Sequence, residues 1–151
     1  MLVKNILEQK DRDTVTAEPG MSVEKAMEAL ITNNISCLPV VENGTLVGII
    51  SDKDIFKKIF EATGDYKKLN VKDIMTENPL VGVPDDELEY VAGVMDQNWI
   101  RHIPIVQGDK VVGIVSQRDV IHFLHHNATL ENRYLNLYME SLHRRDKSGD
   151  Q

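Results

Sequence analysis

The chain has 151 residues, 42% of them apolar, and carries 17 basic against 24 acidic side chains, a formal charge of -7. This length suits one ordinary domain or two very small ones that share a core, and the acidic balance argues against a nucleic-acid partner. No apolar stretch approaches the ~20 residues of a membrane helix, and the start MLVKNILEQKDRD turns charged too early for a signal peptide. We therefore expect a cytoplasmic protein with no membrane partner.

The first half of the chain predicts five elements in the order strand, helix, strand, strand, helix: residues 15–17, 23–30, 38–41, 46–50 and a helix that starts at Ser51. Apolar side chains recur at three- and four-residue steps through the first of the two helices. Asn43-Gly44 separates the two longer strands, and this dipeptide strongly predicts a tight hairpin.

A polar connection at residues 62–69 and a helical turn at 71–75 lead into a second half that repeats the same order. Its elements are expected at residues 80–83, 88–95, 103–106, 111–115 and from Ser116 onward. Residues 35–55 align with 100–120, and eight positions are identical: Ile35/Ile100, Pro39/Pro104, Val41/Val106, Val47/Val112, Gly48/Gly113, Ile49/Ile114, Ser51/Ser116 and Asp54/Asp119.

The repeat defines the fold class, an α/β (α+β) protein of two β-α-β-β-α repeats related by a pseudo-twofold axis. A unit of ~60 residues is marginal alone, so two three-stranded sheets and their helices should cover each other. The predicted domains are repeat 1 at residues 1–64, repeat 2 at 65–127, and a tail at 128–151. Apolar residues at helical spacing predict an amphipathic C-terminal helix in the tail, and the final RRDKSGDQ predicts disorder.

The most informative motif is GIISDKD at residues 48–54, which returns as GIVSQRD at 113–119. Serine followed three residues later by aspartate, ahead of an apolar helix, is typical of a capping box. The same geometry places a hydroxyl and free amides at a helix start beside a carboxylate, which suits the two hydroxyls of a ribose. Glycine inside a strand often marks the close approach of another group, so Gly48 and Gly113 favour a ligand or the backbone of the opposite repeat there.

These motifs, together with ISCLPVV and IRHIPIV, resemble those of a tandem pair of CBS domains, also called a Bateman module, over residues 1–126. The resemblance implies a sensor, not an enzyme, that binds AMP, ADP, ATP, NAD or S-adenosylmethionine in the cleft between the repeats as a regulatory ligand. No catalytic cofactor is implied. It also implies a homodimer and an effector protein as partner, since the chain leaves no room for an effector domain.

Carrying the family pattern across gives two candidate ligand sites. The first would use Thr14, Val15, Thr16, Ser36, Cys37, Leu38, Pro39, Ser51, Lys53 and Asp54. The second would use Pro79, Leu80, Val81, Arg101, His102, Ile103, Pro104, Ser116, Arg118 and Asp119. In each site the aspartate would hold the ribose. Because arginine suits phosphate better than lysine does, the second site is expected to take the more phosphorylated ligand.

Other readings of the chain stay open at this point. The alternative function is a dimeric interaction protein with vestigial clefts, and a small nucleotide-using enzyme is a third, weaker reading. His122, His125 and His126 fall on one helix face, but a helix C-terminus explains them more simply than a metal site, and we expect none. The single cysteine, Cys37, excludes an internal disulfide and predicts a packed small residue. Trp99 is expected to pack against the connection or to report on the second cleft.

Overall fold

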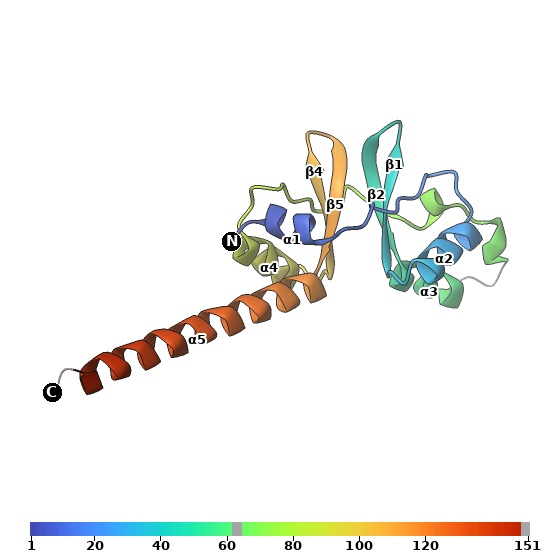
Figure 1. The fold of residues 1–151 in the computed structure, drawn as a ribbon. Coiled ribbons are helices and arrows are strands. Elements are labelled where there is room, and N and C mark those ends of the chain that lie inside the picture. The colour runs from blue at the N-terminus through green and yellow to red at the C-terminus, as the bar shows by residue number, and fades with distance from the viewer. Residues whose placement is uncertain (62–64, 149–151) are drawn as a thin grey trace. The chain divides into compact units, whose positions relative to one another are not determined.

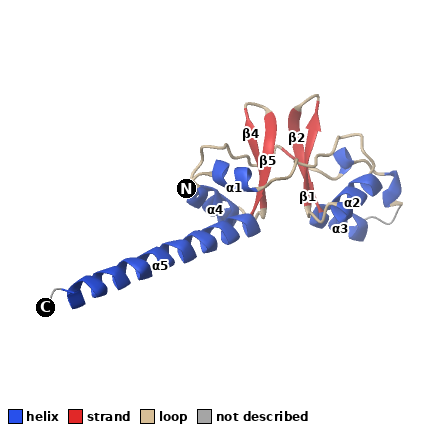
Figure 2. Cartoon of the chain, viewed as in Figure 1, coloured by secondary structure: helices blue, strands red, loops and turns tan. Residues whose placement is uncertain are grey.

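The computed structural model describes the backbone of residues 1–61 and 65–148 and the side chains of these residues through position 140 (Figures 1 and 2). The chain forms two compact units, residues 1–117 and 118–151. The first unit contains two β-hairpins that lie side by side, with β2 of one facing β5 of the other (Figure 1). A hydrogen bond from the amide of Leu46 to the carbonyl of Asp109, at 3.1 Å, joins them.

The hairpins reproduce the sequence repeat in their hydrogen bonding. The first pairs β1 (Cys37–Glu42) with β2 (Thr45–Ser51), and the second pairs β4 (His102–Gln107) with β5 (Lys110–Ser116). Both registers are antiparallel and equivalent, including one irregularity at the same place in each, between Val40 and Val41 and between Ile105 and Val106. Asn43 and Gly44 both adopt positive φ, at 50° and 81°, as the predicted two-residue turn requires.

The helices pack their predicted apolar faces against these hairpins. In α2 (Val23–Thr32) the buried residues are Val23, Ala26 and Leu30, and in α4 (Leu88–Gln97) they are Leu88, Val91 and Met95. Ser22 caps α2 by accepting a hydrogen bond from the amide of Lys25. The helix after β2, α3 (Asp52–Glu61), buries Ile55. The β-α-β-β-α order is confirmed in its helices and hairpins.

The prediction of two three-stranded sheets was wrong. Each expected first strand is reduced to a single parallel bridge, Ala17 to Val40 and Gly82 to Ile105. The third strand of the first sheet is instead β3 (Thr76–Glu77), which pairs with β2, while β4 and β5 form a two-stranded sheet. Pro19 and Pro84, two residues beyond the bridged Ala17 and Gly82, lack the amide hydrogen that would extend each bridge into a strand.

The segment in front of each repeat packs on the other repeat. Helix α1 (Val3–Gln9) binds the second repeat, where the amides of Val3 and Lys4 donate to the carbonyls of Asp86 and Pro84. The 3-10 turn η2 (Val71–Asp73) makes the equivalent bonds to the first repeat, from Val71 and Lys72 to Met21 and Pro19. We call this arrangement the exchange of the leading segments. The two segments have similar sequences, VKNI at residues 3–6 and VKDI at 71–74, which are 68 positions apart instead of 65.

The exchange explains the two strand glycines. A Cβ at Gly48 would lie 2.8 Å from the Met75 sulfur and 2.9 Å from the Thr76 carbonyl oxygen, and a Cβ at Gly113 would lie 2.5 Å from a terminal methyl of Leu7. Leu7 and Met75 are equivalent positions of the exchanged segments. The close approach predicted from sequence is therefore made by the chain itself.

Alanine at the two glycines is expected to have unequal effects. Gly48→Ala meets backbone at Thr76, which cannot rotate away, so we expect a loss of about 1–3 kcal/mol in the free energy of unfolding. Gly113→Ala meets the end of a leucine side chain that can change rotamer, so its loss should be smaller. Urea denaturation of both variants measures the difference, and equal losses would contradict this explanation.

The second unit is one helix that continues without a break. Helix α5 runs from Gln117 to Ser148, so the expectation of disorder was wrong for residues 144–148, and the rest of that prediction, residues 149–151, lies outside the described residues. The histidines at 122, 125 and 126 consequently lie within the helix and not at its C-terminus, which corrects that explanation. The reason is the absence of glycine and proline from residues 117–148. Among the described helices, none is long and apolar enough to cross a membrane.

Candidate functional site

A pocket of about 630 Å³ lies in the first unit, where the end of β2 and the start of α3 meet the chain that enters the second repeat. This volume falls in the range of small-molecule sites, ~300–1,000 Å³. Eight predicted site residues line it: Cys37, Ser51, Lys53, Asp54, Pro79, Leu80, Arg101 and His102. Eight further lining residues were not predicted as site residues: Ile49, Thr76, Asn78, Met95, Asp96, Trp99, Ile100 and Gln117.

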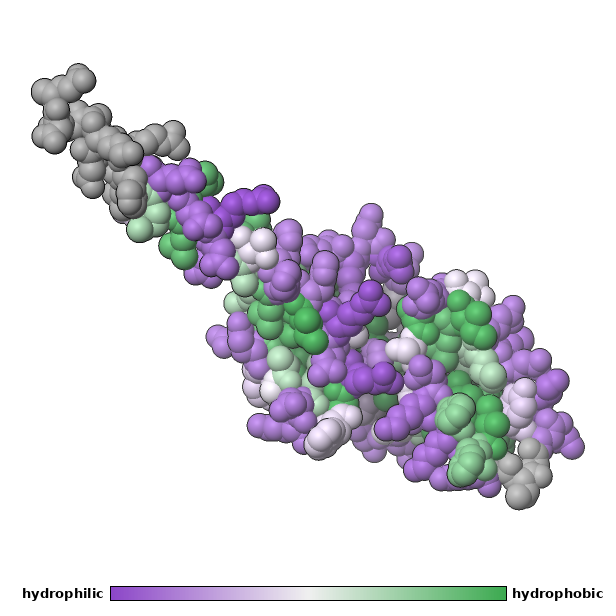
Figure 3. All heavy atoms as spheres, turned by 90° about the horizontal axis from the view of Figure 1, so that it is seen from below, coloured by the Kyte–Doolittle hydropathy of each residue, from purple (hydrophilic) through white to green (hydrophobic). Residues whose placement is uncertain are grey.

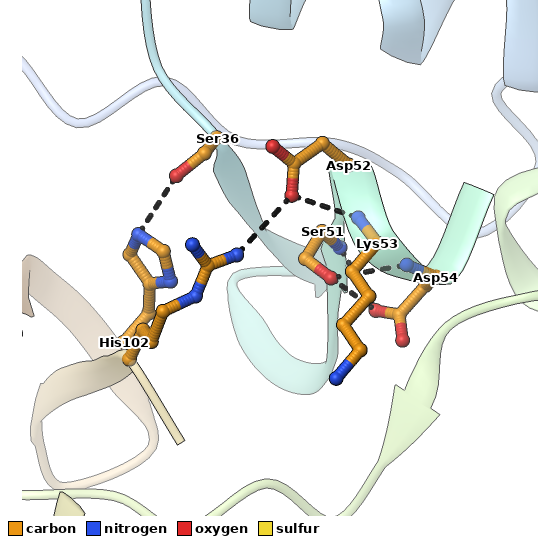
Figure 4. Close-up of polar contacts among 7 residues, drawn as sticks. Ser36, Ser51, Asp52, Lys53, Asp54 and His102 are labelled. Carbon is orange, nitrogen blue, oxygen red and sulfur yellow. Dashed lines mark hydrogen bonds and ion pairs between the residues drawn. The ribbon is translucent and has the colours of Figure 1, made fainter. Parts of the chain in front are cut away.

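Ser51 and Asp54 form the predicted capping box at the start of α3 (Figure 4). The amide of Asp54 donates to the Ser51 hydroxyl oxygen at 3.2 Å, and the Ser51 amide donates to Asp54 Oδ2 at 2.9 Å. The Ser51 hydroxyl donates to the same Oδ2 at 2.9 Å. The capping-box interpretation is confirmed for the first copy of the motif.

The capping role leaves part of the Asp54 carboxylate available. Both hydrogen bonds that this carboxylate accepts use Oδ2, and Oδ1 accepts none from the described residues. Asp54 is half-buried and lines the pocket, and its carboxylate is held by backbone at one oxygen. A fixed carboxylate with one oxygen available is suited to accept hydrogen bonds from ligand hydroxyls.

Two polar contacts connect the repeats beside Ser51 and Asp54 (Figure 4). The Ser36 hydroxyl is hydrogen-bonded to His102 Nε2 at 2.9 Å. Across the same junction a guanidinium nitrogen of Arg101 lies 3.6 Å from Asp52 Oδ1, and both of these side chains are more than half exposed. Exposed ion pairs contribute little free energy. An anionic group of a ligand could therefore take the place of Asp52 beside Arg101 with little loss of stability.

The structure groups the predicted site residues differently from the two sets expected from sequence. Ser51, Lys53 and Asp54 of the first repeat share their pocket with Pro79, Leu80, Arg101 and His102 of the second. The cause is the pairing of β3 with β2, which leads residues 78–80 past the end of β2. Arg101 and His102, which the sequence assigned to the second site, thus line the same pocket as the first aspartate. The expectation that the second site takes the more phosphorylated ligand stays a prediction.

The other predicted residues do not line this pocket. Leu38 and Ile103 are fully buried in the core, and Ser36 contributes only through His102. Thr14, Val15, Thr16, Pro39, Val81 and Pro104 lie outside the lining. Ser116 ends β5, while Arg118 and Asp119 are in the first turn of α5 and belong to the second unit. A second site built on Ser116, Arg118 and Asp119 stays a prediction.

The unpredicted lining residues had a partial signal in the sequence. The exchanged segments place Thr76 and Asn78 beside β2, and the shift of 68 positions between VKNI and VKDI is the pattern that indicates the exchange. Trp99 lines the pocket and is 93% exposed, so it does not pack against the connection as expected. No group of three potential metal ligands occurs among the described residues.

Cys37 is buried at the pocket wall, and its surroundings make it unreactive. Burial, together with the negative charges of Asp54 and Asp52, raises the pKa of the Cys37 thiol from 9.0 to about 12, and the positive charge of Arg101 partly opposes this rise. The thiol is therefore protonated at neutral pH, and the structure agrees with the packed small residue expected from sequence.

This raised pKa predicts an alkaline loss of stability. The unfolded chain loses the thiol proton near pH 9, whereas the folded protein keeps it until about pH 12. The contribution is fully present below pH 9 and falls between pH 9 and 12, by at most ~1.4 kcal/mol per pH unit. Urea denaturation of the wild type and Cys37→Ala at pH 8 and pH 10.5 measures it. The wild type should lose more stability than the variant, and parallel losses would contradict the assignment.

These features define the class of the molecule: a duplicated α/β module with a pocket of small-molecule size shared by its repeats. The model of the CBS domain family matches the chain twice, at residues 3–61 and 71–126, and the chain belongs to this family as a tandem pair. The resemblance stated from sequence and the fold class are confirmed. The pseudo-twofold axis stays a prediction.

Known relatives include an enzyme and a plant CBS protein. The chain is 36% identical over 121 residues to L-aspartate semialdehyde sulfurtransferase of Methanocaldococcus jannaschii, matching 79% of this chain and 22% of that protein. It is 34% identical over 124 residues to the mitochondrial CBS domain-containing protein CBSX3 of Arabidopsis thaliana, matching 79% of this chain and 60% of that one. The chain thus spans only part of the length of these relatives.

Two solved structures of the family contain adenosine compounds. The CBS domain pair of protein MJ0100, in complex with methylthioadenosine and S-adenosyl-L-methionine, has a TM-score of 0.75 at 33% identity and covers 84% of this chain and 98% of that one. CBSX2 in complex with AMP has a TM-score of 0.68 at 26% identity, covering 76% and 90%. Structural relatives of this chain therefore bind adenosine-containing ligands.

Proposed function

We propose that this protein is a regulatory module that binds an adenosine-containing ligand in the pocket around Asp54 and signals to a partner protein. The observation that carries the proposal is the half-buried Asp54 carboxylate, fixed through Oδ2 and lining a pocket of about 630 Å³. A ribose offers two adjacent hydroxyls, and hydrogen bonds to a charged carboxylate are among the strongest available to it. The adenosine compounds bound by related structures support the same ligand class.

The candidate ligands are AMP, ADP, ATP, NAD and S-adenosylmethionine, bound for regulation and not for turnover. Arg101 and Lys53 line the same pocket as Asp54 and would meet a phosphate attached to the ribose. The second site, built on Ser116, Arg118 and Asp119, would take a further ligand of the same class. The proposed module acts in the cytoplasm and has no catalytic cofactor.

Regulation would act through the contacts that join the repeats. A phosphate at Arg101 competes with Asp52, and a ligand across the pocket touches residues of both repeats. A ligand shifts a conformational equilibrium only by the difference between its affinities for the two states. The bound ligand would therefore favour one arrangement of the repeats, which the effector protein would recognise.

Exposed apolar side chains on α3 support association of the module with a second copy. Phe56 is 76% exposed and Phe60 is 86% exposed. Both lie outside the buried face of α3, which contains Ile55. Seen from below, the first unit has hydrophobic patches that are separated by hydrophilic side chains (Figure 3). A homodimer through the exposed face of α3 that carries Phe56 and Phe60 is part of the proposal. The same face would also serve the alternative function, an interaction protein whose pocket is vestigial.

A thermal-shift panel separates these functions. AMP, ADP, ATP, NAD and S-adenosylmethionine would each be added at increasing concentration. A ligand at 100 times its dissociation constant adds ~2.7 kcal/mol to the folded state and raises the melting temperature. A saturable rise with at least one compound supports the module, and no rise with any of them would favour the vestigial pocket. Chromatography of the compounds after incubation tests for turnover. Turnover of any compound would support the interpretation of the protein as a nucleotide-using enzyme.

A further inference from the structure

Trp99 combines a strained backbone with a fully accessible side chain at the pocket. Its φ is +55°, in the left-handed region that bulky residues avoid, and its side chain is 93% exposed. Its indole nitrogen makes no hydrogen bond with the described residues. Neither the strain nor the exposure is compensated by packing within the described chain.

The strain comes from the turn that ends α4. Asn98 is the C-cap of the helix, and the amide of Ile100 donates to the carbonyl of Met95 at 3.0 Å. This bond requires a positive φ at Trp99, the residue between Asn98 and Ile100. Glycine or asparagine usually occupies this position. The conformation of this turn therefore disfavours tryptophan at position 99.

The first repeat contains the same turn with the expected residue. Asn34 has φ +50°, and the amide of Ile35 donates to the carbonyl of Leu30 at 3.0 Å, which matches the bond from Ile100 to Met95. The side-chain amides of Asn33 and Asn98 also make equivalent 2.8 Å bonds to the carbonyls of Ala29 and Val94. The two turns are the same structure, and asparagine satisfies it without a large side chain.

Trp99 differs from Asn34 in what lies beside it. Trp99 lines the pocket of Ser51 and Asp54, together with the apolar side chains of Pro79, Leu80 and Ile100. A strained residue that persists at a site is a reason to look for function there. An exposed indole offers a flat face on which a planar ring can stack, and stacking of a base on an aromatic side chain is favourable for every base.

We propose that Trp99 is a specificity-determining residue that stacks on the base of the bound ligand. This inference rests on the proposed function, because it assumes that the same pocket holds an adenosine compound. It adds a selectivity for ligands with a planar aromatic ring over sugar phosphates that lack one. The stacking contact replaces the solvent around the indole and offsets the strain at the turn.

The substitution that tests this is Trp99→Asn, which introduces the residue of the first repeat. Removing the strain should raise the melting temperature by about 2–4 °C, while the affinity for AMP should fall about tenfold or more. Trp99→Phe keeps an aromatic ring and the strain, so its AMP affinity should stay within about fivefold of the wild type. Binding of ribose 5-phosphate, which has no base, should be equal in the wild type and Trp99→Asn.

Fluorescence gives a second readout, because Trp99 is the single tryptophan of the chain. Titration of the wild type with AMP should change the indole emission, with the same dissociation constant that calorimetry gives. Sedimentation of the wild type and Trp99→Asn, without ligand, tests the competing explanation that the indole contacts a second copy.

The outcomes separate this inference from the proposed function. If the wild type binds AMP in an Asp54-dependent manner but Trp99→Asn binds it equally well and the emission does not change, the stacking role is refuted and the proposed function stands. If Trp99→Asn instead dissociates an oligomer with AMP affinity unchanged, the indole is an interface residue and the inference is overturned. If the wild type binds no adenosine compound, both proposals fail together.

Discussion

Replacing Asp54 by alanine is expected to lower the affinity for AMP about 100-fold or more while the protein stays folded. The variant removes the carboxylate proposed to accept hydrogen bonds from both ribose hydroxyls, and hydrogen bonds to a charged group contribute ~1.5–3 kcal/mol each. The same change removes a helix cap, which should lower the free energy of unfolding by only ~1 kcal/mol. Isothermal titration with AMP and urea denaturation measure the two effects separately.

Asp73, in the turn η2, offers a matched control for Asp54. Asp73 accepts a hydrogen bond from the amide of Asn70 at 2.8 Å, as Asp54 does from Ser51, but Asp73 does not line the pocket. Asp73→Ala should lose a similar stability and keep the AMP affinity of the wild type. Equal losses of affinity in the two variants would show that Asp54 acts only as a cap.

Replacing Arg101 by alanine is expected to lower the affinity for phosphorylated ligands selectively. The affinity should fall about tenfold or more for AMP or ATP and less than twofold for adenosine. The guanidinium lines the pocket, and it is the cation whose ion pair with Asp52 a phosphate would replace. The fold should be unaffected, because this ion pair is exposed and the structural bond at Arg101 uses its carbonyl oxygen, which accepts from the Gln117 amide.

The opposite change supplies the control for Arg101. Asp52→Asn removes the competing carboxylate charge, so it should strengthen AMP binding a few-fold and leave adenosine binding unchanged. Titrations of AMP and adenosine at low and high salt compare the variants. A loss of adenosine affinity in Arg101→Ala, or weaker AMP binding in Asp52→Asn, would contradict the proposed role of this pair.

The repeat unit could be predicted because its signals are local. Apolar spacing defined α2 and α4, Asn43-Gly44 defined the hairpin turn, and the serine and aspartate at positions 51 and 54 defined the cap, each within a window of a few residues. Each of these features depends on neighbouring residues along the chain. Sequence patterns therefore described them correctly.

The composition of the pocket could not be predicted in the same way, because it depends on contacts between distant segments. Residues 78–80 reach Ser51 only because Thr76 and Glu77 pair with β2, and that pairing follows the exchange of the segments before each repeat. The alignment at a shift of 65 positions assigned each aspartate to its own repeat, whereas Asp54 shares its pocket with Arg101 and His102. The length of α5 was also missed, since the boundary expected at residue 127 separated the last helix of the second repeat from the C-terminal helix.

In the proposed function, the pocket beside Ser51 and Asp54 holds the ribose of an adenosine compound. A crystal structure of the protein grown with AMP would show whether it does. We expect AMP between the repeats, with its ribose hydroxyls within hydrogen-bond distance of the Asp54 carboxylate and its phosphate near Arg101. AMP bound at another place on the protein, with this pocket containing only solvent at saturating AMP, would contradict it.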